Sequence, residues 1–111
     1  MDAGKYTEPV TIEKLAEVTE DADGFESETW ENYYSNYAQV NGLFGSERWA
    51  AAQVQMDTSL RFTFRWNRKL DSVKPKRYRL IFRGDIYTIT HVDNVKYGNE
   101  TVRIDAVEVE A

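Results

Sequence analysis

The sequence predicts a mainly β fold, a small antiparallel six-stranded β-barrel or sandwich with one short inserted α-helix. Two observations support this prediction: apolar and polar residues alternate over most of the chain, and turn-forming residues separate the alternating stretches. Alternation places apolar side chains on one face of each strand, and short strands joined by hairpins usually close as a barrel or sandwich. The 111 residues suit one domain, residues 1–111, in which we expect residues 1–8 to form a flexible leader.

The alternation is clearest in two arginine-rich stretches, residues 61–66 and 77–83. Their apolar faces comprise Phe62, Phe64, Trp66, Tyr78, Leu80 and Phe82, and their polar faces are dominated by Arg61, Arg65, Arg77, Arg79 and Arg83. Strands of this kind bury one face in a core and leave the other in solvent or at an interface. We therefore expect the aromatic residues to form the core and the arginines to lie outside it.

The remaining strands follow from weaker patterns. Residues 10–18 and 28–40 predict the first two strands, joined by a loop at residues 21–24, and residues 86–92 and 101–109 predict the last two. Gly84-Asp85 predicts a tight hairpin turn, because glycine tolerates the positive φ that such turns require. Residues 97–99 predict a second turn. After Ala106 the apolar pattern shifts to Val107 and Val109, which predicts a β-bulge.

Residues 41–57 differ in character from the stretches on either side. Gly42 and Gly45 flank an expected turn, and Ser46 is a candidate helix N-cap. The alanine-rich residues 49–53 have high helix propensity. We expect one short helix here, inserted between the second and third strands.

Charge is strongly segregated along the chain, whose net charge is −5. Residues 1–60 carry a net charge of −9, residues 61–84 carry +8, and residues 85–111 carry −4. A chain with opposite blocks of charge can pair with copies of itself, or with an anionic partner at one face only.

The residues that catalysis and metal binding usually require are scarce. The chain has no cysteine and a single histidine, His91, which leaves no strong basis for a histidine metal cluster or a serine–histidine triad. Its glycines are scattered at turns and form no phosphate-binding loop. We also see no signal peptide and no apolar stretch long enough to cross a membrane. We expect no catalytic residue, no metal site, no cofactor and no membrane partner, and we predict that the protein is not an enzyme.

The basic stretch between residues 61 and 83 is the most suggestive surface. Its candidate basic residues, facing a partner or lying close to DNA, are Arg61, Arg65, Arg68, Lys69, Lys74, Lys76, Arg77 and Arg79. A stacking platform for single strands needs aromatic and cationic groups on one face, whereas the alternation puts them on opposite faces. This geometry favours a protein interface. The alternative is an OB-like barrel that binds single-stranded nucleic acid through residues 61–83.

The order of several short motifs resembles phage head–tail joining proteins, also called head–tail adaptors or head-completion stoppers. The motifs are Val10-Thr11-Ile12, Glu28-Thr29-Trp30-Glu31, Ala38-Gln39-Val40, Gly45-Ser46-Glu47 followed by the alanine-rich residues 49–53, the strand Arg61-Phe62-Thr63-Phe64-Arg65, and a hairpin from Arg79 to Ile89 with Gly84 at its centre and Tyr87 after it. Each motif is short, and their common order and spacing over nearly the whole chain carry the resemblance.

This resemblance implies a structural protein of a phage or prophage, a head–tail connector. Family members assemble as homo-oligomeric rings beneath the portal, extend or close the DNA channel and dock the tail. The implied partners are copies of the chain itself, a portal or adaptor protein, a tail-interface protein and, without sequence recognition, the packaged DNA. The implied location is the neck of the virion, with assembly in the host cytoplasm. The candidate channel-facing or subunit-contact residues would then be Gly42, Leu43, Phe44, Gly45, Glu47, Arg48, Trp49 and Gln53.

Overall fold

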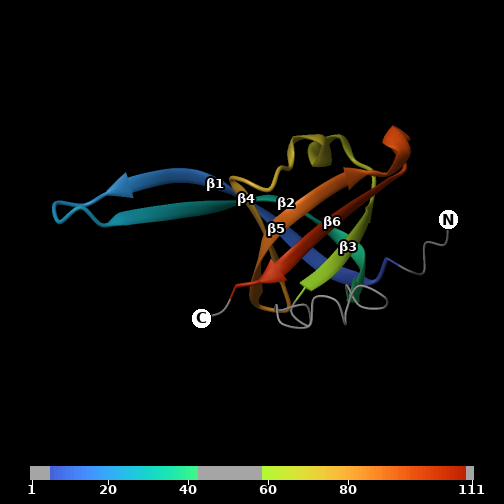
Figure 1. The fold of residues 1–111 in the computed structure, drawn as a ribbon, viewed down its shortest axis with the longest axis horizontal. Coiled ribbons are helices and arrows are strands. Elements are labelled where there is room, and N and C mark those ends of the chain that lie inside the picture. Colours follow the sequence, from blue (N-terminus) through green and yellow to red (C-terminus); the bar gives the residue numbers. More distant parts are fainter. Residues whose placement is uncertain (1–5, 43–58, 110–111) are drawn as a thin grey trace, which may run out of the picture.

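Six antiparallel strands close into a barrel in the computed structural model, which describes residues 6–42 and 59–109 (Figure 1). The strands are β1 (Glu8–Glu20), β2 (Glu26–Gly42), β3 (Ser59–Arg65), β4 (Tyr78–Phe82), β5 (Asp85–Asn94) and β6 (Thr101–Glu108), with two short 3₁₀ helices, η3 (Arg68–Ser72) and η4 (Val95–Tyr97). Their order around the barrel is β1-β2-β3-β6-β5-β4, and β4 pairs with β1 to close it. The predicted mainly β fold is confirmed, while the helix expected at residues 49–53 lies outside the described residues.

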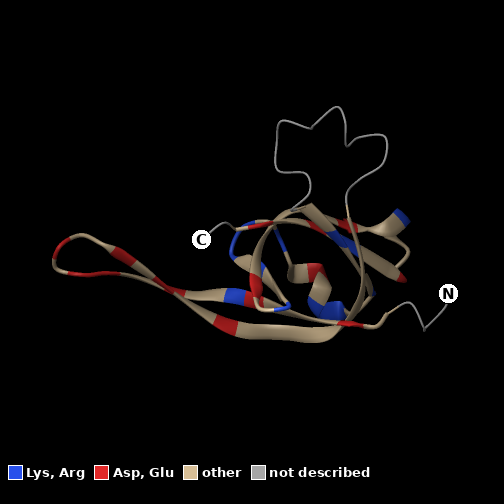
Figure 2. Ribbon diagram, turned by 90° about the horizontal axis from the view of Figure 1, so that it is seen from below, with Lys and Arg blue, Asp and Glu red and all other residues tan. Residues whose placement is uncertain are grey.

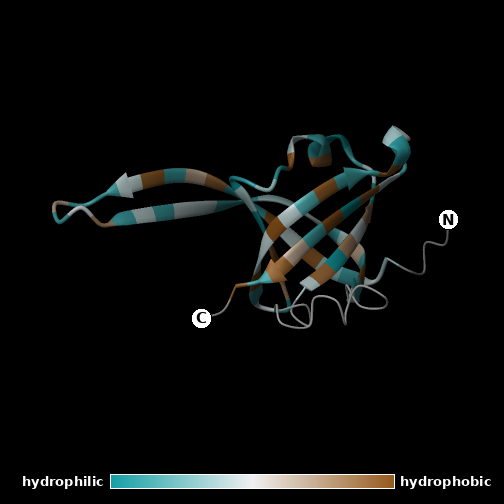
Figure 3. Cartoon of the chain, viewed as in Figure 1, coloured by the Kyte–Doolittle hydropathy of each residue, from teal (hydrophilic) through white to brown (hydrophobic). Residues whose placement is uncertain are grey.

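Alternating side chains fill the barrel interior, as the two arginine-rich stretches predicted. Phe62, Phe64 and Leu80 are fully buried, and Tyr78 and Phe82 are nearly so. Trp66 is only partly buried and packs against the edge of this core. The banding of apolar and polar residues along the barrel strands is visible in Figure 3.

An aromatic cluster forms the densest part of the core. The ring of Phe62 lies edge-on to Phe82 and Tyr87, with centroid distances of 5.4 and 5.5 Å. Edge-to-face packing of this kind adds to the free energy of burial, because the ring edges are electropositive and the faces electronegative. Phe62 therefore joins three strands, β3, β4 and β5, at one point.

Tyr87 gives the fold a dependence on alkaline pH. Burial raises the pKa of its phenol above the ordinary 10.0, and the nearby carboxylates of Glu108 and Asp85 raise that pKa further. The unfolded chain then loses this proton at a lower pH than the folded chain. The stability that Tyr87 contributes through this difference in pKa is fully present below about pH 10. It decreases as the pH rises from there towards the higher pKa of the folded state.

We expect Tyr87→Phe to weaken this alkaline loss of stability. The measurement is the free energy of unfolding by urea at several values from pH 8.5 to 11. Tyr37→Phe is the matched control, since the Tyr37 side chain is 58% exposed. If both variants lose stability with pH as steeply as the parent chain, the role of Tyr87 is contradicted.

The helix η3 closes one end of the barrel. Leu70 and Val73, each 1% exposed, reach into the core from this segment. Asn67 caps the helix by accepting a hydrogen bond from the Lys69 amide, and the indole of Trp66 donates to the Asp71 carboxylate at 3.0 Å. Figure 2 views the barrel along its interior, with η3 lying across the far end.

A long two-stranded arm projects from the side of the barrel (Figure 1). β1 and β2 have 13 and 17 residues, but β1 pairs with β4 only over residues 11–14, and β2 pairs with β3 only over residues 39–42. We call residues 16–29 the arm, since all of them are exposed. Two register shifts lie where the strands leave the barrel, between Ile12 and Glu13 and between Leu15 and Glu17. Such bulges bend and twist a strand pair, and here they mark the base of the arm.

Three local predictions need correction. The hairpin turn between β4 and β5 is centred on Arg83-Gly84, both with positive φ, and Asp85 already begins β5. Two successive residues with positive φ match the twist of the flanking strands. The turn therefore lies one residue earlier than predicted. The bulge predicted after Ala106 lies instead on β5, between Ile89 and His91, while the pairing of β6 with β3 is regular. Strand β1 begins at Glu8, which the sequence placed in the leader.

Candidate functional site

The predicted basic residues differ in the contacts that they make. Two of them are paired with carboxylates across neighbouring strands. The guanidinium of Arg61 donates to both carboxylate oxygens of Asp105, at 2.8 and 3.2 Å, and Arg79 donates to Glu13 at 2.8 Å. In each pair the two residues are direct partners in the strand register, so the sheet itself sets the geometry.

Several cations also lie over aromatic rings. Arg79 stacks on Trp30 with its guanidinium carbon 4.2 Å from the ring centroid, and Lys69 lies 5.4 Å from the centroid of Tyr33. Arg65 lies 5.3 Å from the ring centroid of Tyr6. These rings come from the N-terminal segment and from β2, whereas the aromatic residues interleaved with the arginines in the sequence are mostly buried. The rings of Trp30, Tyr33 and Tyr6 are thus already occupied by cations, which does not favour base stacking on them.

Four predicted basic residues are exposed and have neither an ion pair nor a ring contact with any described residue: Arg68, Lys74, Lys76 and Arg77. They lie on η3 and on the segment that leads from it to β4. Arg77 has a φ of 72°, and its backbone carbonyl accepts a hydrogen bond from the amide of Leu15. The segment from Arg68 to Arg77 therefore presents an exposed group of cations.

The other predicted contact segment begins at the opposite end of the barrel from η3. Gly42 ends β2 and pairs with Leu60 at the start of β3, whereas η3 follows the far end of β3. The remaining candidates of this segment, Leu43, Phe44, Gly45, Glu47, Arg48, Trp49 and Gln53, lie outside the described residues. Within the described residues, Gly42 thus lies at the opposite end of the barrel from η3.

The arm is a charged element that the sequence prediction missed. Residues 16–29 contain six carboxylates and no lysine or arginine, and Figure 2 shows acidic bands along the arm. The alternation beyond Leu15 predicted strands correctly, but it did not reveal that both faces of these strands are in solvent. The sequence signal that could have indicated this exposure was the run of carboxylates on both sides of the turn.

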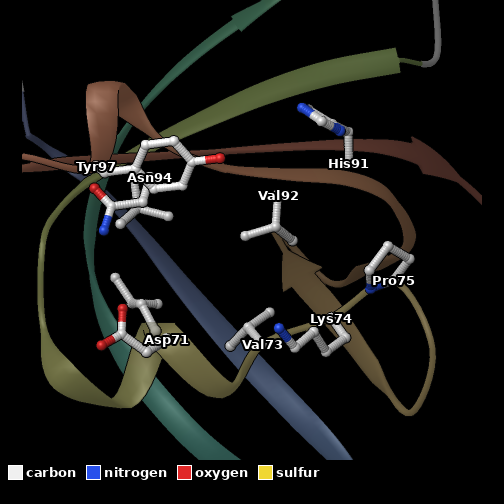
Figure 4. A pocket seen from close by; sticks show the side chains of 10 residues that line it. Asp71, Val73, Lys74, Pro75, His91, Val92, Asn94 and Tyr97 are labelled. Atoms are coloured by element: carbon white, nitrogen blue, oxygen red, sulfur yellow. The ribbon is translucent and has the colours of Figure 1, made fainter. Parts of the chain in front are cut away.

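A hollow of about 490 Å³ opens beside η3, between this helix and β5. Its lining is mixed, and Figure 4 places His91 and Asp71 on opposite sides of it. The Asp71 carboxylate is already bound by the Trp66 indole. We see no pairing of a base with a nucleophile around this hollow.

Within residues 6–42 and 59–109, no three histidine or acidic side chains gather in a way that could hold a metal ion. In the same part of the chain, no helix is long and apolar enough to cross a membrane.

Comparisons with known proteins identify a family through one family model and a shared fold through two solved structures. The profile of a family described as "Phage head completion protein" matches residues 1–109. Protein SF1141 from Shigella flexneri 2a, solved in solution, superposes with a TM-score of 0.66 at 21% identity, over 97% of this chain and 96% of that one. A chain of the virion of a native gene transfer agent particle gives a TM-score of 0.59 at 19% identity, over 93% of this chain and 94% of that one. No curated protein matches the sequence.

Proposed function

Because the chain belongs to the phage head completion protein family, we propose that it is a connector subunit in the neck of a phage or prophage particle. Its role is that of a structural protein of the phage particle. In this proposal, copies form a homo-oligomeric ring below the portal, extend or close the DNA channel and dock the tail. Assembly on the portal would take place in the host cytoplasm.

The observation that supports this proposal best is the separation of charge on the folded chain. The charged side chains of the arm are all carboxylates, whereas η3 and the segment from it to β4 carry five exposed cations without ion pairs to the described residues. Different surfaces of one subunit that complement each other lead to head-to-tail contacts, which close as a ring when the rotation between copies allows it.

The test is assembly with the cognate portal protein. We expect co-expression to give a stable complex in which electron microscopy shows a ring of small barrels on the portal. A monomer in the absence of portal agrees with the proposal, because ring closure can require the portal as a template. Failure of the folded full-length chain to bind its portal, at low and physiological salt, would refute it.

A further inference from the structure

We propose that the acidic arm of one copy docks into a groove at the base of the arm of the next copy. This inference rests on the proposed assembly into a ring and names the surfaces that meet in it. The occupant of the groove is the tip of the arm, residues 18–26, of a second copy of this chain.

The tip of the arm is an ordered turn that presents apolar side chains to solvent. Asp21 organises it: its carboxylate accepts hydrogen bonds from the amides of Asp23 and Phe25, each at 2.9 Å. Gly24 takes a φ of 84°, which an L-residue adopts only with strain. This turn holds Phe25 with 70% of its surface exposed, and Val18, which lies opposite Glu28 in the strand pair, is 48% exposed. Such exposure of a large ring on an ordered turn is typical of an anchor for a partner.

The groove lies on the outer face of the barrel where the arm begins. It has a volume of about 330 Å³, and its apolar lining includes Trp30, Pro75, Ile86 and Val109. Ile86 and Val109 are 36% and 46% exposed, and the Val109 amide donates to the Ile86 carbonyl at 2.8 Å, which holds the two side by side. Four of the six large exposed apolar residues in the described chain thus belong either to the arm or to this groove.

The charges of the two surfaces are complementary. Arg77 lines the groove together with Arg79, and Lys74 and Lys76 flank Pro75 at its edge. Arg79 is already paired with Glu13, whereas Arg77, Lys74 and Lys76 have no such partner among the described residues. On the arm, Glu20 and Glu26 face each other in the strand register, and like charges in that position are destabilising. Contact with the cationic edge of the groove relieves this repulsion. Glu28 also lies at the groove, so the carboxylates of the docked arm must lie on the side of the cations and away from Glu28.

The arm cannot fill the groove of its own chain. Between Leu15 and the turn at Asp21, β1 continues for residues 16–20, or roughly 17 Å, away from the barrel. The groove adjoins the base of the same arm, at Trp30. Docking must therefore be between copies, and it joins two different surfaces, which is the arrangement that builds rings.

A cross-linking experiment tests the docking directly, because the chain has no cysteine of its own. One preparation carries Phe25→Cys with a size tag, and the other carries Ile86→Cys. The two are mixed under mild oxidation, both as free protein at high concentration and as the portal complex. A disulfide requires Cα atoms about 4.4–6.8 Å apart, so it reports close approach of the tip to the groove.

The matched control replaces Ile86→Cys by Tyr97→Cys. Tyr97 is 91% exposed, so random collisions should cross-link it at least as well as Ile86. We expect the groove cysteine to give at least about tenfold more heterodimer than the control, because docking raises the effective concentration of the two thiols. Raising the salt concentration before oxidation should lower this yield, because it screens the charged edge.

Two results would overturn the docking. One is a yield with Ile86→Cys no higher than with Tyr97→Cys in both preparations. The other is cross-linking of Phe25→Cys to the portal or to a tail protein in place of the groove. The measurement on free protein separates this proposal from the connector role. A chain that fails to bind portal but forms the disulfide refutes the connector role alone. A chain that binds portal without any selective disulfide refutes the docking alone.

Discussion

Phe62→Ala is expected to lower the free energy of unfolding by about 3–5 kcal/mol, the usual cost of deleting a buried phenylalanine ring. Phe62 is fully buried, and its ring contacts two other aromatic rings, from β4 and β5, inside the barrel. Its removal leaves a cavity that three strands line, and a closed barrel has little freedom to collapse around it. Urea denaturation followed by circular dichroism measures the loss.

Phe25→Ala is the matched control for this variant. It makes the same chemical change at a side chain that is 70% exposed, outside the barrel. We expect its stability to change by no more than about 0.5 kcal/mol, as is usual for surface substitutions. Equal losses in the two variants would contradict the separation of the core from the arm.

Leu70→Ala is expected to cost about 2–5 kcal/mol and to loosen one end of the barrel. Leu70 is the buried residue of η3, and its amide donates to the Asn67 carbonyl while its own carbonyl accepts from the Val73 amide. Without the leucine side chain, this short helix has little apolar area left with which to hold the barrel end. Hydrogen exchange should therefore quicken at the amides of Leu70 and Val73 more than in the centre of β3 and β6.

Leu60→Ala serves as the comparison, because Leu60 is only partly buried and lies at the other end of β3. We expect it to cost less than Leu70→Ala and to leave exchange at η3 unchanged. Unaltered exchange at Leu70 and Val73 in the Leu70→Ala chain would show that η3 is held mainly by other contacts. The hydrogen bond between Trp66 and Asp71 would then be the first such contact to examine.

The strands and the core could be predicted because each depends on local alternation. Phe62 and Phe64, like Tyr78, Leu80 and Phe82, face the interior as their spacing predicts. The turn at Arg83-Gly84 was displaced by one residue, because sequence identifies the glycine but not which of its neighbours shares the positive φ. The bulge was assigned to the wrong strand, since an irregular pairing can be accommodated by either partner.

The basic surface could not be predicted from the sequence, because its composition depends on contacts between distant residues. Arg61 and Asp105 are 44 positions apart, and Arg79 and Glu13 are 66 apart, yet each pair lies opposite in the sheet. A count of cations in residues 61–84 therefore overstates the free positive charge. Ion pairs and ring contacts together leave Arg68, Lys74, Lys76 and Arg77 as the part of that block available to a partner.

The arm also has a consequence for solubility. A closed barrel has no free strand edge, but a two-stranded hairpin in solvent has two, each with backbone groups ready to accept a further strand. The closely spaced carboxylates of residues 16–29 repel any second arm that approaches in parallel or antiparallel alignment. The same acidic residues can therefore protect unassembled subunits from stacking into fibrils while they await incorporation into the particle.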